Sequence, residues 1–334
     1  MPVAQGMPQA RSVLCQDTIM PTPLYILATD ENFDEDGYLA ANPDVAEAHR
    51  KGLVRNLRHH FEKFGRREGR RIRIEASFAE LRDEKIRRIE PLLKRDMPHT
   101  RRGAKYDFLT ADLRASAGVV DTANISSHEY DDVVLRLIED HKSGTILDCG
   151  AGRRPTYHAN VVNFDIVDFD TTDILGVGEQ LPFQDHAFDA VISIAVLEHV
   201  RDPAACAAEI VRVLKPGGKL VCCVPFLQPL HGFPRHYYNM TSQGLRALFE
   251  STMQIDEQFV SDSGLPIWSL TWILESWARG LSGRAREQFL SMPVRDFLES
   301  PAALLDRSWV RQLSKEKNFE LASATMLIAH KPRA

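Results

Sequence analysis

Three histidines stand where the chain could remove a proton from a reacting group. His199 lies in the segment LEHV, and His231 and His236 lie in the segment PLHGFPRHYYN. Imidazole changes its charge near neutral pH, so a histidine can act as a general base on a hydroxyl group. The sequence therefore predicts His199, His231 and His236 as catalytic candidates, with His128 as a further one.

The segment from Pro225 to Thr241 is rich in polar and aromatic side chains. It follows a predicted strand, and packing alone does not explain this density in a loop. We predict that the segment binds the substrate. The residues predicted to contact the substrate are Phe226, His231, Arg235, His236, Tyr237 and Tyr238, and the same segment also holds Phe233 and Asn239.

The stretch TILDCGAG, residues 145–152, is typical of a buried strand that ends in a ligand-binding turn. Asp148 closes the strand, and Gly150 and Gly152 follow it. Glycine has no Cβ atom, so the backbone can approach a ligand closely at these positions. Glycine pairs also occur in ordinary turns, and this stretch by itself leaves both interpretations open.

The order of elements around this turn predicts a doubly wound α/β fold. Continuous apolar runs separated by helical segments indicate a parallel sheet with helices on both faces. Asp202 and Pro203 open one such helix, and Ser127 is predicted to cap a helix that ends near His141. The strands predicted after the first are residues 161–165, 172–175, 188–195, 219–225, 255–260 and 322–329.

A long insert, residues 266–318, separates the last two predicted strands. It holds all four tryptophans, Trp268, Trp272, Trp277 and Trp309. Their spacing predicts a helical lid or subdomain, and core packing explains them more simply than substrate stacking.

Four stretches in order resemble the class I S-adenosylmethionine-dependent methyltransferases, specifically the type 11 methyltransferase domain. They are ILDCGAG, the strand ending in Asp165, GVGEQLPFQDHAFDAVISIAVLEHV and RVLKPGGKLVCCVP, within residues 144–241. The resemblance implies a Rossmann-like, seven-stranded sheet and S-adenosylmethionine as cofactor. It implies that the cofactor is bound by Asp148, Gly150, Gly152, Asp165, Ile166, Gly178, Glu179 and Ala195.

The chain departs from this family's pattern at two positions. Arg154 stands at the third glycine position, and only 17 residues separate Asp148 from Asp165, so the first crossover helix is expected to be short or irregular. Val177 replaces the aspartate that faces the adenine amine in relatives. Arg154 is expected to reach either the cofactor carboxylate or solvent.

The chain before residue 122 is predicted to be a separate region. We divide it into a flexible leader (1–30), a helical module (31–95) and a linker (96–121), followed by the methyltransferase domain (122–334). The module contains YLAxNPDV and HFxxxGxxEGR, and it resembles a short unit found in bacterial glycan-assembly proteins. Self-association or a protein partner is a further possible role for this module.

Composition and charge are those of an ordinary globular protein. The net charge is −5, but residues 50–105 hold 19 Lys and Arg against 8 Asp and Glu. A solvated helical face explains this surplus better than a polyanionic partner, because acidic residues are interleaved. No secretory signal or membrane span is recognisable, which predicts a cytoplasmic protein. The five cysteines predict reduced thiols, and no histidine and cysteine spacing predicts a metal site.

The leading hypothesis is methyl transfer to a small polar acceptor, a sugar, nucleotide-sugar or glycan end. RNA methylation is an alternative suggested by the basic segment, but neither an N-P-P-Y motif nor a Pro-Cys nucleophile motif is present, so a nucleic-acid partner is not favoured. A non-catalytic, methyltransferase-like scaffold is the third hypothesis, suggested by Arg154 and Val177.

Overall fold

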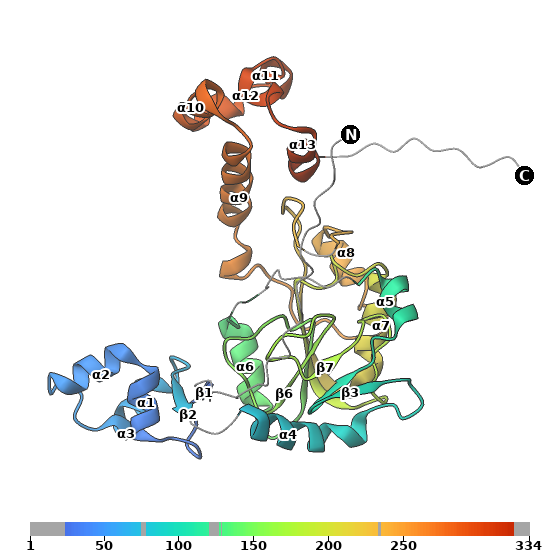
Figure 1. The fold of residues 1–334 in the computed structure, drawn as a ribbon. Helices are drawn as coiled ribbons and strands as arrows, with labels where there is room; N and C mark the ends of the chain where they lie inside the picture. The colour runs from blue at the N-terminus through green and yellow to red at the C-terminus, as the bar shows by residue number, and fades with distance from the viewer. Residues whose placement is uncertain (1–23, 75–77, 120–126, 128, 233–234, 324–334) are drawn as a thin grey trace, which may run out of the picture. The chain divides into compact units, whose positions relative to one another are not determined.

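The computed structural model describes residues 24–74, 78–119, 127, 129–232 and 235–323. It divides into two compact units, Met1–Leu81 and Arg82–Ala334 (Figure 1). Within the described residues, no helix has the length and apolar character needed to cross a lipid bilayer. The boundary falls inside helix α4 (Phe78–Ile89), earlier than the predicted end of the helical module at residue 95.

The first unit is a small α+β module. Strand β1 (Leu24–Leu27) pairs antiparallel with β2 (Arg71–Ile74), so the predicted leader, residues 1–30, ends in a strand. Tyr38 and Phe61 are fully buried at its centre. The remaining elements are α1 (Glu35–Ala41), α2 (Pro43–Arg50), α3 (Leu57–His60) and η1 (Phe61–Gly65).

Much of the basic character of this unit is neutralised locally. Arg58 and Arg66 both pair with Asp30, and Arg70 pairs with Asp44. These pairs lie at the surface, as expected for a solvated helical face.

The second unit is built on a seven-stranded sheet in the order β3-β4-β7-β6-β5-β8-β9. β3 pairs antiparallel with β4, and the other neighbours are parallel. The strands are β3 (Thr100–Arg102), β4 (Lys105–Asp107), β5 (Ile146–Cys149), β6 (Val161–Asp165), β7 (Ile174–Leu175), β8 (Phe188–Ile194) and β9 (Leu214–Cys223).

Two strands of this sheet were not predicted. β3 and β4 lie in the segment predicted as the linker, residues 96–121, which also forms α5 (Ala111–Ala117). That prediction was wrong because buried Tyr106 and Phe108 anchor this segment in the core. The predicted strand 255–260 is absent, since Phe259 and Val260 are more than half exposed. The predicted strand 322–329 lies mostly outside the described residues.

Helices cover both faces of the sheet (Figure 1). On one face, α6 (Asp132–Asp140) packs Val134 and Ile138 against Ile146 of β5. On the other face, α4 and α7 (Pro203–Val213) contribute Ile89 and Ile210 to the larger core. The predicted doubly wound fold is therefore correct. The cap of α6 is Asp131 rather than Ser127, because the Asp131 side chain accepts hydrogen bonds from the amides of Val133 and Val134.

The connection from β5 to β6, residues 150–160, is described in full and contains no helix. Two buried polar contacts hold it instead. Arg154 pairs with Asp148, and the Tyr157 hydroxyl donates to Asp173. Asp173 also pairs with Lys85 of α4, whose Nζ lies 2.9 Å away. A short or irregular crossover helix was expected here, and the structure replaces it with an irregular connection.

The predicted insert is helical and has its own core. Trp277 stacks on Phe289, and Trp309 packs beside both. Trp268 and Trp272 are 48% and 38% exposed, so core packing explains only two of the four tryptophans. The remaining elements of this unit are η2 (Glu90–Leu92), α8 (Ser242–Ala247), η3 (Asp262–Gly264), α9 (Pro266–Arg279), α10 (Gly283–Ser291), η4 (Val294–Leu298), α11 (Pro301–Leu304), α12 (Ser308–Arg311) and α13 (Lys315–Leu321).

Candidate active site

The carboxyl ends of β5, β6 and β8 meet at one edge of the sheet. β5 lies between the other two strands and is parallel to both. In an open parallel sheet, this point of reversed strand order is where ligands bind. The predicted residues Gly150, Asp165 and Ala195 follow or end these three strands, so the fold brings the predicted cofactor residues to a common edge.

The glycine turn, residues 150–152, folds toward the end of β6. Gly150 and Gly152 have φ values of +87° and +62°. The Gly152 amide donates to Oδ2 of Asp165 over 2.7 Å, and the Val167 amide donates to Oδ1 over 2.8 Å. A Cβ atom on Gly150 would lie 2.9 Å from Cγ1 of Val196, so this position has room only for glycine.

Asp165 is a buried carboxylate held by two backbone amides. Burial raises the pKa of Asp165 to about 6, and the two amide hydrogen bonds act in the opposite direction. Each carboxylate oxygen has two acceptor positions, so each can accept one further hydrogen bond. Asp165 can therefore receive two hydroxyl donors from a ligand.

Asp148 lies fully buried at the end of β5. Its Oδ2 accepts from Nε of Arg154 over 2.8 Å and from the hydroxyl of Tyr130. The Arg154 guanidinium lies 4.1 Å from the centre of the Tyr130 ring. The expectation that Arg154 reaches solvent was wrong, because its side chain is buried against Asp148. Its contact with the cofactor carboxylate stays a prediction.

The other oxygen of Asp148 points to a ligand role. Oδ1 is buried and accepts no hydrogen bond from the residues that the structure describes. A buried carboxylate oxygen without a donor is costly, and a cationic ligand group would satisfy it. An ammonium group beside the glycine turn would supply such a donor.

Residues 177–179, which follow β7, all make contacts within the protein. Val177 is buried among Leu109 and Leu175, in an apolar cluster that Ile166 and residues of α5 extend. A Cβ atom on Gly178 would lie 2.7 Å from Sγ of Cys206, and the Glu179 carboxylate accepts from the Arg201 amide. The predicted cofactor roles of Ile166, Gly178 and Glu179 stay predictions.

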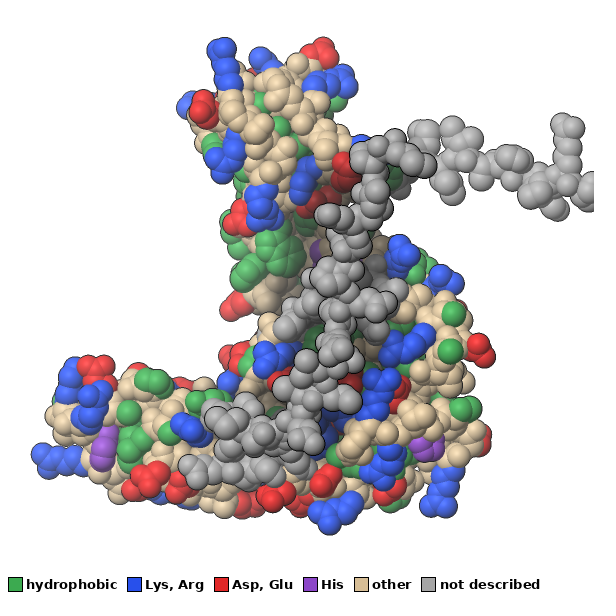
Figure 2. All heavy atoms as spheres, in the orientation of Figure 1, with side chains coloured by type: hydrophobic (Ala, Val, Ile, Leu, Met, Phe, Trp, Pro, Cys, Tyr) green, Lys and Arg blue, Asp and Glu red, His purple; other side chains and the backbone are tan. Residues whose placement is uncertain are grey.

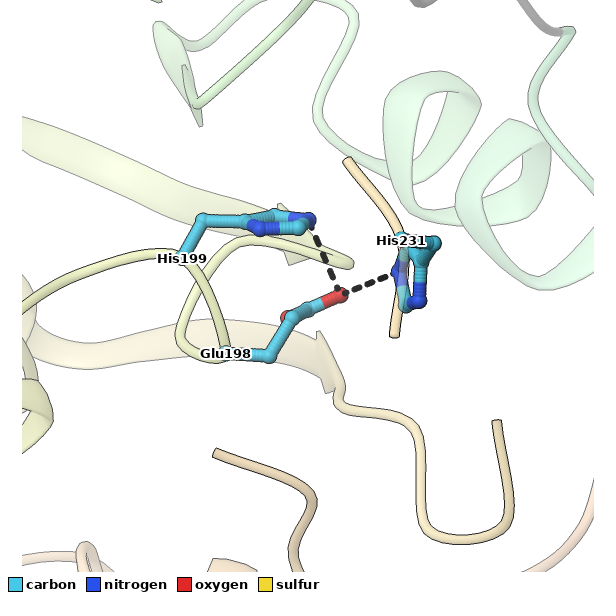
Figure 3. A group of neighbouring side chains, drawn as sticks. All are labelled: Glu198, His199 and His231. Atoms are coloured by element: carbon cyan, nitrogen blue, oxygen red, sulfur yellow. Dashed lines mark ion pairs between the residues drawn. The ribbon is translucent and has the colours of Figure 1, made fainter. Parts of the chain in front are cut away.

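Glu198 and His199 follow β8 in the chain and lie beside His231 (Figure 3). The His236 ring packs against both histidine rings, and we call these four residues the histidine cluster. The ring centres of the three histidines lie 4.3 to 5.6 Å apart. Nε2 of His199 lies 3.7 Å from Oε1 of Glu198, and Nε2 of His231 lies 4.0 Å from the same oxygen. The structure thus joins three histidines that were predicted separately.

Glu198 is the functional candidate that the sequence analysis did not name. Its side chain is fully buried, and neither carboxylate oxygen accepts a hydrogen bond from the described residues. Burial raises the pKa of Glu198 to about 7, and burial lowers the pKa values of His199 and His236. The sequence could have indicated Glu198, because it directly precedes His199 and follows the carboxyl end of a predicted strand.

Most of the predicted substrate-binding segment surrounds Glu198. The amides of Tyr237 and Tyr238 both donate to the Glu198 carbonyl, and the Arg235 carbonyl lies 2.7 Å from Nδ1 of His199. The Phe226 side chain is 54% exposed, and its predicted contact with the substrate stays a prediction. The predicted candidates His128 and Phe233 lie outside the described residues.

Comparison with known proteins agrees with this geometry. The family model described as a methyltransferase domain matches residues 149–222, which span the glycine turn, β6, β7, β8 and most of β9. The sheet order and the glycine turn are those of the class I S-adenosylmethionine-dependent methyltransferase fold. The match covers 74 of the 334 residues, and the resemblance to methyltransferase domains applies to that segment.

Two curated relatives are demethylmenaquinone methyltransferases. The protein from Renibacterium salmoninarum is 37% identical over 123 residues, covering 37% of this chain and 45% of the relative. The protein from Paenarthrobacter aurescens is 32% identical over 155 residues, covering 46% of this chain and 54% of the relative. The chain spans about half the length of these relatives.

One solved structure that matches part of the chain is the 1,6-didemethyltoxoflavin-N1-methyltransferase of Burkholderia thailandensis with bound 1,6-didemethyltoxoflavin and S-adenosylhomocysteine. It is 19% identical, covers 40% of this chain and 73% of its own, and has a TM-score of 0.30.

Proposed function

We propose that this protein transfers a methyl group from S-adenosylmethionine to a small acceptor bound beside the histidine cluster. One observation carries the proposal: the glycine turn, Asp165 and the histidine cluster follow neighbouring strands at the same edge of the sheet. At this edge the glycine turn and Asp165 can bind the cofactor, and the histidine cluster can accept the proton that the acceptor loses.

The residues at the glycine turn fit S-adenosylmethionine. Asp148 Oδ1 would accept from the ammonium group of its methionine portion, and Asp165 would accept from its two ribose hydroxyls. The glycine turn admits the backbone to the same ligand. The bound cofactor supplies a methyl group already activated by the sulfonium. Ala195 is exposed and has a φ of +56°. It follows β8 directly and precedes Glu198 by three residues.

The histidine cluster supplies the base that an acceptor hydroxyl needs. A carbonyl oxygen can only accept, so Nδ1 of His231 carries its proton and donates to the Pro229 carbonyl over 2.9 Å. Nε2 of His231 then keeps a lone pair directed toward Glu198. This nitrogen can take a proton from an acceptor and share it with the Glu198 carboxylate.

For the acceptor, the structure favours a hydroxylated ring with an apolar substituent. Leu227 and Leu230 of the predicted substrate segment are more than half exposed, and so are Ile267 and Leu270 of α9. Figure 2 shows hydrophobic side chains gathered over α9. The curated relatives act on demethylmenaquinone by name, which is an apolar ring compound of this kind.

A sugar hydroxyl is the second candidate acceptor. The side chains of Arg235, Tyr238 and Asn239 give the loop after β9 a polar, exposed rim that suits a sugar. The comparisons contain no support for the glycan context predicted from the first unit, so this acceptor depends on the loop alone.

Methyl transfer can be tested with labelled S-adenosylmethionine and two sets of acceptors, short-chain naphthoquinols and nucleotide-sugars. We expect label in the naphthoquinols. Label in the nucleotide-sugars alone would overturn the proposed acceptor, but the protein would still be a methyltransferase. If isothermal titration shows no binding of S-adenosylmethionine up to about millimolar concentration, the scaffold hypothesis replaces the enzyme. Salt-dependent labelling of RNA would favour the RNA hypothesis instead.

The affinity for S-adenosylmethionine should rise with pH and level off above about pH 7. Ribose hydroxyls favour the ionised carboxylate of Asp165, whose pKa is about 6. Below that pKa, affinity should fall by up to about tenfold per pH unit. The free energy of unfolding has the opposite pH dependence. Because the pKa of Asp165 is raised in the folded state, its protonated form stabilises the fold, and this contribution is lost as the pH rises through about 6.

Titration calorimetry between pH 5 and pH 8 measures this dependence. The variant Asp165→Asn should bind about 100-fold more weakly at pH 7.5, because hydrogen bonds to a charged group contribute about 1.5 to 3 kcal/mol each. It should also lose the pH dependence. An unchanged pH profile in Asp165→Asn would assign the dependence to another group.

A further inference from the structure

We propose that Glu198, His199 and His231 bind one divalent transition-metal cation. One oxygen of the carboxylate and one nitrogen of each histidine all lie within 4.8 Å of one another (Figure 3). A cation with ligand distances of about 2.0 to 2.2 Å would hold such atoms roughly 3 to 3.6 Å apart. Small side-chain rotations bring the three groups to that spacing.

The buried carboxylate of Glu198 is the first reason for a cation here. The side chain is completely buried, and the described residues donate no hydrogen bond to either oxygen. Buried carboxylates are normally hydrogen-bonded, paired or coordinated to a metal. The Nε2 atoms of His199 and His231 lie 3.7 and 4.0 Å from Oε1, too far for hydrogen bonds.

The hydrogen bonds of the two histidines are the second reason. Nδ1 of His199 donates to the Arg235 carbonyl over 2.7 Å, and Nδ1 of His231 donates to the Pro229 carbonyl over 2.9 Å. Both rings therefore carry their proton on Nδ1 and direct a free Nε2 lone pair toward Glu198. Metal-binding histidines are held in the same way, by a carbonyl or carboxylate on the far nitrogen.

His236 belongs to the histidine cluster but is not one of the three proposed ligands. Its Nδ1 accepts from the amide of His231 over 3.2 Å, and its Nε2 donates to Oδ1 of Asn239 over 3.0 Å. Both nitrogens are thus occupied, which leaves three ligands. Two imidazoles and one carboxylate favour transition cations such as Zn²⁺ or Mn²⁺ over Mg²⁺ or Ca²⁺, which prefer oxygen ligands.

The three ligands leave coordination positions for solvent or for an acceptor oxygen. If the proposed function holds, the cation would replace Nε2 of His231 as the group that activates the acceptor hydroxyl. It would bind that hydroxyl and lower its pKa, so that the reacting oxygen is an alkoxide or phenolate. This step moves one proton to solvent or to a neighbouring base and needs no other reactant. The cation site itself does not depend on that role.

Metal binding can be measured on the full-length protein without any acceptor. After dialysis against EDTA, titration with Zn²⁺ should show one site. The variants Glu198→Gln, His199→Gln and His231→Gln should each weaken that site by at least about 100-fold, because the loss of even an outer hydrogen-bond partner costs about 10- to 100-fold in metal affinity. Mn²⁺ binding followed by electron paramagnetic resonance gives a second readout.

The matched control is His59→Gln, which removes an exposed histidine of the first unit and should leave the site unchanged. Circular dichroism and S-adenosylmethionine binding show whether each variant is folded. A Zn²⁺ site that survives in folded Glu198→Gln and His231→Gln, or the absence of a site in the wild type, overturns the proposal. S-adenosylmethionine binding without a metal site rejects only the cation, and a metal site without S-adenosylmethionine binding rejects only the proposed function.

Discussion

Asp148→Ala is expected to lower the free energy of unfolding of the second unit by about 3 to 5 kcal/mol. The change removes the carboxylate that pairs with the buried Arg154 guanidinium over 2.8 Å. It also removes the acceptor of the Tyr130 hydroxyl. Breaking a buried ion pair costs far more than breaking an exposed one. Urea unfolding followed by circular dichroism measures the difference.

The same unit offers a matched control in the pair of Arg153 and Asp170. Its atoms lie 3.0 Å apart, close to the 2.8 Å of the buried pair, but both side chains are about half exposed. Asp170→Ala should therefore cost less than about 1 kcal/mol. Equal losses for Asp148→Ala and Asp170→Ala would show that the buried pair has no special role in the fold.

Asp148→Ala should also abolish S-adenosylmethionine binding, and the two effects can be separated. Arg154→Met combined with Asp148→Ala removes both charges, so stability should recover substantially while the cofactor acceptor remains absent. Recovered stability with restored cofactor binding would exclude Asp148 as the residue that holds the ammonium group.

The central strands of this fold were predictable because their sequences are continuously apolar. β6 lies at its predicted residues, 161–165, and β8 ends one residue before its predicted limit. The edge strand β3 and its neighbour β4 are three residues long and contain Arg101, Arg102 and Lys105. Such short charged segments carry no strand periodicity, and only pairing with β7 makes them part of the sheet.

In the candidate site too, the features set by local sequence were predictable and those set by distant contacts were not. The glycine turn and Asp165 were predictable because local backbone geometry fixes them next to strand ends. The direction of the Arg154 side chain was not, since it depends on Tyr130, 24 positions earlier in the sequence. The histidine cluster likewise needs the loop after β9 to fold back over Glu198 through the amides of Tyr237 and Tyr238.

Gly232→Ala is expected to reduce kcat about 100-fold, because it moves His199 within the histidine cluster. Gly232 has a φ of +79°, and a Cβ atom built there would lie 2.9 Å from Nε2 and 3.0 Å from Nδ1 of the His199 ring. The ring would have to leave the Arg235 carbonyl and its place beside Glu198. A displacement of about 1 Å in a reacting group costs about 100-fold in rate.

Gly217→Ala separates this displacement from backbone strain. Gly217 has nearly the same φ, +78°, but a Cβ atom there meets nothing within 4 Å. Both variants should therefore lose about 1 to 2 kcal/mol of stability from the left-handed conformation, while only Gly232→Ala loses turnover. Because Asp165 and Asp148 lie at the other strand ends, S-adenosylmethionine affinity should stay unchanged in both variants. If kcat falls equally in the two variants, strain rather than the position of His199 explains the loss, and the histidine cluster has no part in the reaction.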